Sequence, residues 1–139
     1  QNLSGQCLWL KPAGVGTRYY PVGFTNDVEA SGSLYQRQGG AALLPLSNGQ
    51  GLLSFSAGGL RAPFTNPVVL SLRNRLSSSD NPTLTFKLNA ASGLFTGSTT
   101  AWPLGKFFFQ GALLQDGNLG AGYFLGPETG GAVLLAPAP

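Results

Sequence analysis

Apolar and polar residues alternate along much of the chain, which is the pattern of strands with one buried and one solvated face. The clearest case is the segment 83–90, TLTFKLNA, where every second residue is apolar. The segment 68–76, VVLSLRNRL, continues the pattern and places Arg73 and Arg75 on its solvated face. The turn sequence SSSDNP lies between these segments, so a hairpin is predicted over residues 68–90.

Further apolar segments follow at regular intervals, separated by sequences rich in Gly, Pro, Asn and Asp. They read GLFTGSTTA, KFFFQGALLQ, GAGYFLG and AVLLA. Asp116-Gly117 is a suitable hairpin turn because glycine accepts a positive φ without steric cost. Residues 68–136 therefore predict an antiparallel meander of about five strands.

The first half of the chain is less regular. SGQCLWLK and GLLSFSAGG are credible strands, while YYPVGFTN and SGSLYQR are shorter candidates. Helical periodicity is interrupted throughout by Gly and Pro, so no substantial helix is expected. With about eight to ten strands, a single sheet would curl, and an all-β small antiparallel barrel is predicted, with a β-sandwich as the alternative.

Phenylalanine and glycine recur together, two positions apart, in three of these strands. The pairs are Phe95 with Gly97, Phe109 with Gly111, and Phe124 with Gly126, at intervals of 14 and 15 residues. Each ring is expected to cover the glycine that follows it in its own strand, where the sheet can bend sharply. We therefore assign Phe86, Phe95, Phe109 and Phe124 to the interior. The alternative is that the glycines clear space for a ligand ring.

Length and composition agree with one folded all-β domain over residues 1–139. Only 9% of the residues are charged and 42% are apolar, with 21 glycines and 10 prolines. Turns use Gly and Pro, whereas a disordered linker would not carry nine phenylalanines. Because the chain contains no methionine, we expect it to be excised or processed from a longer protein that is secreted or held at the cell surface.

Charge and cysteine content exclude several classes of partner and site. The net charge of +3 is spread over scattered basic residues, so no nucleic-acid partner is expected. No apolar run approaches the roughly 18 residues of a membrane-spanning helix. The single cysteine, Cys7, excludes an internal disulfide. Cys7 alternates with Leu8 in an apolar stretch, and Trp9 lies two residues after Cys7, so both are assigned to the interior.

Candidate catalytic chemistry is sparse. The chain has no histidine, which removes Ser-His-Asp and Cys-His arrangements and most zinc sites. Of the five carboxylates, only Asp27 and Glu29 could share a strand face, while Asp80, Asp116 and Glu128 lie in turn sequences. No calcium-binding loop pattern is present. We therefore predict no catalytic residue, no metal and no cofactor.

Aromatic residues in the irregular segments are the candidate ligand-binding residues. They are Tyr19, Tyr20, Tyr35 and Trp102. Rings presented from loops can stack on sugars or on a protein partner. The alternative is that these rings plug the open ends of the barrel.

Several segments, in this order, resemble the C-terminal part of an uncharacterised all-β repeat domain. They are LSGQCLWLKPA, RYYPVGFTN, GSLY, GLFTGS, FQGALLQ and GAGYFLGPETGGAVLL. That domain occurs in large secreted multidomain proteins of environmental bacteria, often beside immunoglobulin-like or propeller repeats. The sequence departs from it at Leu10, where Ile is commoner, and at Leu34, where Arg is usual. The family also carries strands upstream of the LSG motif, which implies that the barrel is closed differently here or borrows a strand.

The expected function is that of a non-catalytic extracellular module, either structural or binding a polysaccharide or a protein surface. A barrel that holds a small apolar ligand is the first alternative. A glycan-active enzyme is the third choice. A filled interior would argue against the ligand barrel, and a surface patch of aromatic rings would favour the polysaccharide.

Overall fold

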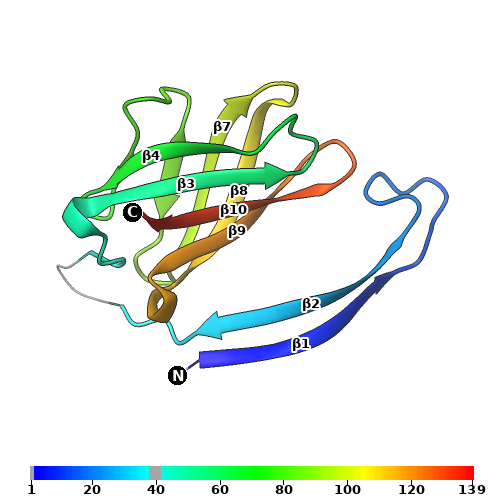
Figure 1. The fold of residues 1–139 in the computed structure, drawn as a ribbon, viewed down its shortest axis with the longest axis horizontal. Coiled ribbons are helices and arrows are strands. Elements are labelled where there is room, and N and C mark those ends of the chain that lie inside the picture. Colours follow the sequence, from blue (N-terminus) through cyan, green and yellow to red (C-terminus); the bar gives the residue numbers. More distant parts are fainter. Residues whose placement is uncertain (1, 38–41) are drawn as a thin grey trace.

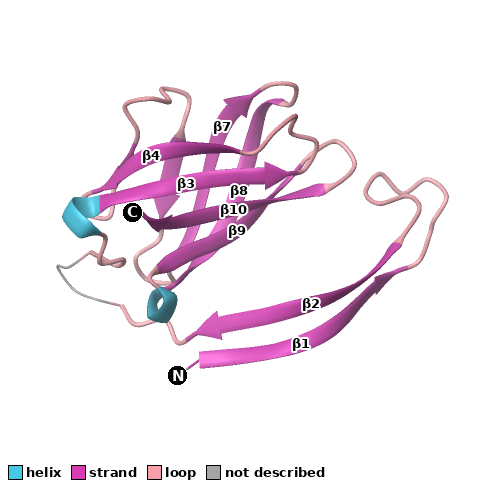
Figure 2. Ribbon diagram, viewed as in Figure 1, coloured by secondary structure: helices cyan, strands magenta, loops and turns pink. Residues whose placement is uncertain are grey.

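The protein is almost entirely β in a computed structural model, which describes residues 2–37 and 42–139 (Figures 1 and 2). The strands are β1 (Asn2–Lys11), β2 (Phe24–Ser33), β3 (Gln50–Ala57), β4 (Phe64–Leu70), β5 (Leu76–Ser77), β6 (Thr85–Leu88), β7 (Leu94–Ala101), β8 (Gly105–Leu114), β9 (Leu119–Leu125) and β10 (Gly130–Pro137). Two single 3₁₀ turns, η1 (Ser47–Gly49) and η2 (Gln115–Gly117), are the helical elements of the described residues.

Eight of the strands form one antiparallel sheet that curls into a nearly closed barrel, as predicted. Its order is β5-β4-β3-β10-β9-β8-β7-β6. The strands β6 to β10 follow one another as a meander, and β10 then pairs with β3. The remaining strands, β1 and β2, form a separate two-stranded sheet, which lies beside the barrel on the side of β9 (Figure 1).

The hairpin predicted over residues 68–90 is wrong. β4 ends at Leu70 because Asn74 adopts a left-handed φ of 58° and its N–H donates to the Ser71 carbonyl over 2.8 Å. The chain therefore turns here, and β4 pairs with the two-residue strand β5. Asparagine tolerates a left-handed backbone, and this signal within the apolar pattern was missed. Leu72, which falls on the apolar face of the alternating pattern, is exposed in the turn, and Arg73 and Arg75 are exposed as expected.

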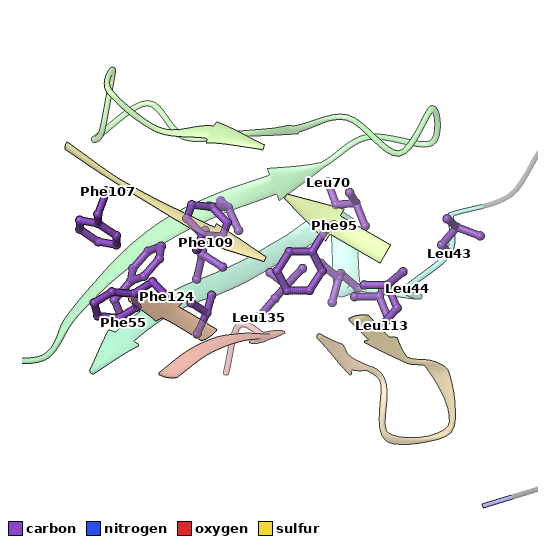
Figure 3. Packing of buried hydrophobic residues seen from close by; sticks show 14 residues of the cluster. Leu43, Leu44, Phe55, Leu70, Phe95, Phe107, Phe109, Leu113, Phe124 and Leu135 are labelled. Atoms are coloured by element: carbon purple, nitrogen blue, oxygen red, sulfur yellow. The ribbon is translucent and has the colours of Figure 1, made fainter. Parts of the chain in front are cut away.

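Phenylalanine side chains fill the interior of the barrel. Phe95, Phe109 and Phe124 are buried, which confirms their assignment, and Phe86 is half-buried with its ring stacked 5.1 Å from that of Phe95. Phe55 is completely buried and meets the rings of four other phenylalanines. Figure 3 shows the rings of Phe55, Phe107, Phe109 and Phe124 on one side of the core, Leu43, Leu44 and Leu113 on the other, and Phe95 between them. The interior is thus occupied by the protein's own side chains.

The phenylalanine rings do cover glycines, but each ring covers a glycine on the neighbouring strand and not the glycine two positions further along its own strand. Phe109 faces Gly97 and Phe95 faces Gly111, so a Cβ at either glycine would overlap the opposing ring. Phe124 likewise covers Gly131 of β10. The predicted partner of Phe124, Gly126, instead approaches the backbone of Gly58. Facing residues are closer to each other than residues i and i+2, which is why the ring settles on the neighbouring strand.

A polar cluster bridges the open seam of the barrel between β5 and β6. The Asn81 side chain, in the loop between these strands, donates 3.0 Å to Asn66 Oδ1 of β4 and 2.9 Å to Thr99 Oγ1 of β7. Its own Oδ1 accepts from the Thr83 backbone and hydroxyl. Asn66 and Thr99 are buried. The Asn81 side chain therefore links β4 to β7 at the seam, where the edge strands β5 and β6 do not pair with each other.

Replacing Asn81 with alanine is expected to lower the free energy of unfolding by about 2 to 3 kcal/mol, because two buried acceptors lose their donor. Urea unfolding followed by fluorescence measures this. Asn26→Ala is the control, since Asn26 is exposed on β2. Equal, small losses for both variants would show that the cluster does not stabilise the seam.

The β1–β2 hairpin has both faces exposed, which overturns the assignment of Cys7 and Trp9 to the interior. Cys7 is exposed, and Trp9 is 60% exposed with its ring against Phe24. The alternation was read correctly as a strand, but β1 pairs only with β2 and no layer of the described chain covers it. At its tip, the backbone N–H of Tyr20 donates 2.9 Å to the Glu128 carbonyl, which attaches the hairpin to the barrel.

Candidate functional site

The strand β8 presents an aromatic ring to solvent. In the run Phe107-Phe108-Phe109, successive side chains point to opposite faces of the sheet. Phe107 and Phe109 are 5% and 2% exposed, whereas Phe108 is 71% exposed. Tyr123 and Leu125 on the neighbouring strand β9 are also about half-exposed, and this group of apolar side chains marks the outer face of β8 and β9 as a candidate site.

An open hollow of about 830 Å³ lies around this ring, and we call it the outer hollow. It lies where β8 and β9 separate, because their pairing stops at Phe109 and Phe124 while β8 continues back to Gly105. Residues of β6 to β9 line it, together with Arg18, Leu104 and the turn after β9. The lining includes outward residues and also the inward-facing residues Phe86, Phe107, Phe109 and Phe124. Phe108 and the half-exposed ring of Tyr123 are its outward aromatic side chains.

Hydrogen-bonding groups surround these rings in a regular row. Lys87, Thr96, Gln110 and Tyr123 face one another across β6, β7, β8 and β9. Gln110 Nε2 donates to the Tyr123 hydroxyl, which holds the two side chains together. In the next row, the Thr85 and Ser98 hydroxyls are 2.9 Å apart beside Phe108. The outer hollow thus combines apolar rings with hydroxyl, amide and ammonium groups.

The aromatic residues predicted to bind a ligand do not come together in one site. Trp102 lies in the turn between β7 and β8, is 72% exposed, and has the Arg61 guanidinium 5.5 Å from its ring centre. Tyr19 is half-buried beneath Arg18, which lies 5.3 Å from its ring centre and itself lines the outer hollow. Both lie outside the lining of the hollow.

The other two predicted residues make structural contacts. The Tyr20 hydroxyl accepts a 2.7 Å hydrogen bond from the Gly130 backbone and joins the tip of the β1–β2 hairpin to β10. The Tyr35 hydroxyl donates 2.7 Å to the Ala90 carbonyl, and its ring covers Gly93. Tyr35 thus closes the end of the barrel near the turn between β6 and β7. The contacts of Tyr35 therefore agree with the alternative that the loop rings plug the open ends of the barrel.

Phe108 and Tyr123 lie on strands, so the prediction of exposed rings in loops did not include them. A signal was nevertheless present. Three consecutive phenylalanines on one strand must place one ring on the outer face, and Tyr123-Phe124 must likewise point in opposite directions. Since Phe109 and Phe124 were already assigned to the interior, strand alternation alone places their neighbours Phe108 and Tyr123 on the outer face.

None of the five carboxylate residues lines the outer hollow. Asp27 and Glu29 share a face of β2, as predicted, but that face is exposed, and neither residue lines the hollow. Asp80, Asp116 and Glu128 occupy loops or turns. Within residues 2–37 and 42–139, no group of three or more His, Cys, Asp or Glu side chains could hold a metal ion. In the same ranges, no helix is long and apolar enough to cross a membrane.

Comparison with known proteins gives no relative from which a function could be carried over. No family model matches the chain, and no match is found among curated proteins or solved structures. The resemblance to a secreted repeat domain therefore stays a prediction, and the function has to be argued from the outer hollow itself.

Proposed function

We propose that the protein is a non-catalytic extracellular module that binds a polysaccharide in the outer hollow. The observation that carries this proposal is the exposed Phe108 ring on a regular strand, beside Tyr123 and within an open hollow. Aromatic faces stack on the apolar faces of sugar rings, and a rigid strand holds such a ring in place at little entropic cost.

The surrounding polar groups support a sugar over a purely apolar ligand. Thr85, Thr96, Gln110 and Tyr123 offer hydroxyl and amide groups around the ring. Such groups can pair with sugar hydroxyls, which both donate and accept hydrogen bonds. The interior packed with phenylalanine favours a surface site over an internal apolar ligand. The position of the five carboxylates outside the lining favours binding over hydrolysis.

The double variant Phe108→Ala/Tyr123→Ala is expected to lose retention on insoluble polysaccharide, because both stacking surfaces are removed. The measurement is a pull-down of the 139-residue protein on cellulose, chitin, xylan and insoluble pectin. The melting temperature of the double variant is expected to stay within a few degrees of the unmodified protein, since exposed side chains contribute little to stability.

Trp102→Ala is the control in the same assay. It removes an equally exposed ring that lies outside the outer hollow, and we expect it to keep full retention. Retention lost in Trp102→Ala and kept in the double variant would place binding at the loop aromatics instead. Failure of the unmodified protein to bind any of the four materials would contradict the proposed function.

A further inference from the structure

The charges around the outer hollow identify the class of polysaccharide. We propose that the hollow binds an acidic polysaccharide built from uronic acid residues, with its carboxylates held by Arg18, Lys87 and Lys106. This inference rests on the proposed function and deepens it. The evidence that it adds is the set of basic side chains in the lining.

The three cations line the same hollow as Phe108. Lys106 lies two residues before Phe108 on the same face of β8, and its Nζ is 5.4 Å from the centre of the ring. Lys87 is on β6, two strands away, or about 10 Å across the sheet. Arg18 approaches from the β9 side, where its Nε donates 3.2 Å to the Pro127 carbonyl. A sugar ring stacked on Phe108 would thus lie beside Lys106, in a hollow that Lys87 and Arg18 also line.

The lining contains these three basic residues and no acidic residue. Three of the eight lysines and arginines of the chain therefore gather at this one surface. The acidic residue nearest to the lining in sequence is Glu128, which follows Pro127 and whose backbone carbonyl accepts from Tyr20. A surface with cations and no anions attracts anionic ligands and steers their approach.

Uronic acids fit this combination of groups better than sulfated sugars. In a uronic acid, the carboxylate replaces only the exocyclic CH₂OH group, so the ring keeps its hydroxyls and its apolar face. Sulfate esters instead consume hydroxyls that Thr85, Thr96 and Gln110 would pair with. The planar Arg18 guanidinium also matches a carboxylate through two parallel hydrogen bonds.

The test compares binding of the 139-residue protein to polygalacturonate, to dextran sulfate and to neutral dextran by affinity electrophoresis. We expect polygalacturonate to bind tightest, and added salt to weaken that binding. In Lys87→Gln/Lys106→Gln, affinity for polygalacturonate should fall by about tenfold, as for the loss of two exposed charge pairs. Both lysines are exposed, and an unchanged circular dichroism spectrum would verify folding.

The matched control is Arg73→Gln/Arg75→Gln, which removes the same charge from the turn between β4 and β5, outside the hollow. We expect it to change affinity by less than about twofold. An equal loss in both double variants would mean attraction by net charge and would overturn the inference. So would tighter binding of dextran sulfate or of neutral dextran. Binding of neutral polysaccharides alone would leave the proposed function standing, whereas binding of none would contradict both.

Discussion

Replacing Phe109 with alanine is expected to lower the free energy of unfolding by about 3 to 5 kcal/mol, as for other buried aromatic residues. Phe109 is 2% exposed, and its ring lies 5.1 Å from that of Phe55 in an edge-to-face contact. The same ring covers Gly97 on β7, so its removal leaves a cavity and also uncovers the backbone of the neighbouring strand. Both effects act at the centre of the sheet.

The measurement is chemical denaturation of the variant beside Phe108→Ala. The two substitutions are identical and adjacent, yet Phe108 points outward, and its loss should cost less than about 1 kcal/mol. A large difference between neighbours is a direct consequence of strand alternation. Similar losses for both would mean that β8 does not have the described orientation, and a Phe109→Ala loss below about 1 kcal/mol would place its ring outside the core.

Replacing Gly111 with valine is expected to cost about 3 kcal/mol, at the upper end of the range for overpacked cores. A Cβ at this position would overlap both the Phe95 ring and the Ala121 carbonyl oxygen. The ring could rotate away, but the carbonyl belongs to the paired strand β9 and can move only if the ladder between β8 and β9 shifts. Thermal and urea unfolding measure the effect.

Gly5→Val serves as the control for this substitution. Gly5 lies in the middle of β1 and has no atom within 4 Å of an added Cβ. Valine favours strands, so the control is expected to leave stability nearly unchanged. If Gly111→Val were tolerated as well as Gly5→Val, the explanation of the Phe–Gly pattern by ring packing would be wrong.

Much of the fold follows from sequence pattern because alternation and turn residues are local signals. The meander from β6 to β10 was predicted in this way, and so was the burial of Phe95, Phe109 and Phe124. The hairpin with its turn at Asn74 was missed, because Leu72 and Leu76 continue the apolar alternation straight through the turn. The left-handed backbone of Asn74 turns the chain despite this apolar alternation.

Long-range arrangement could not be read in the same way. Trp9 and Cys7 lie in a well-predicted strand, yet whether a strand is covered depends on which other strands pack against it. The same limit applies to the outer hollow. Lys87, Lys106 with Phe108, and Tyr123 come from three strands that the sheet register brings to one face. Arg18 joins them from the loop between β1 and β2 through its hydrogen bond to the Pro127 carbonyl. The prediction that aromatic residues in loops bind the ligand therefore included Tyr35, which packs against the core.

Chemical-shift mapping tests the central claim that the face around Phe108 is the binding surface. Oligogalacturonate is titrated into ¹⁵N-labelled protein, and the shifts of the backbone amides are followed. The largest changes are expected at Lys106–Gln110 and at Tyr123, with almost none along β1. Largest changes around Tyr35 or within the strands β1 and β2, or no change at any amide, would contradict it.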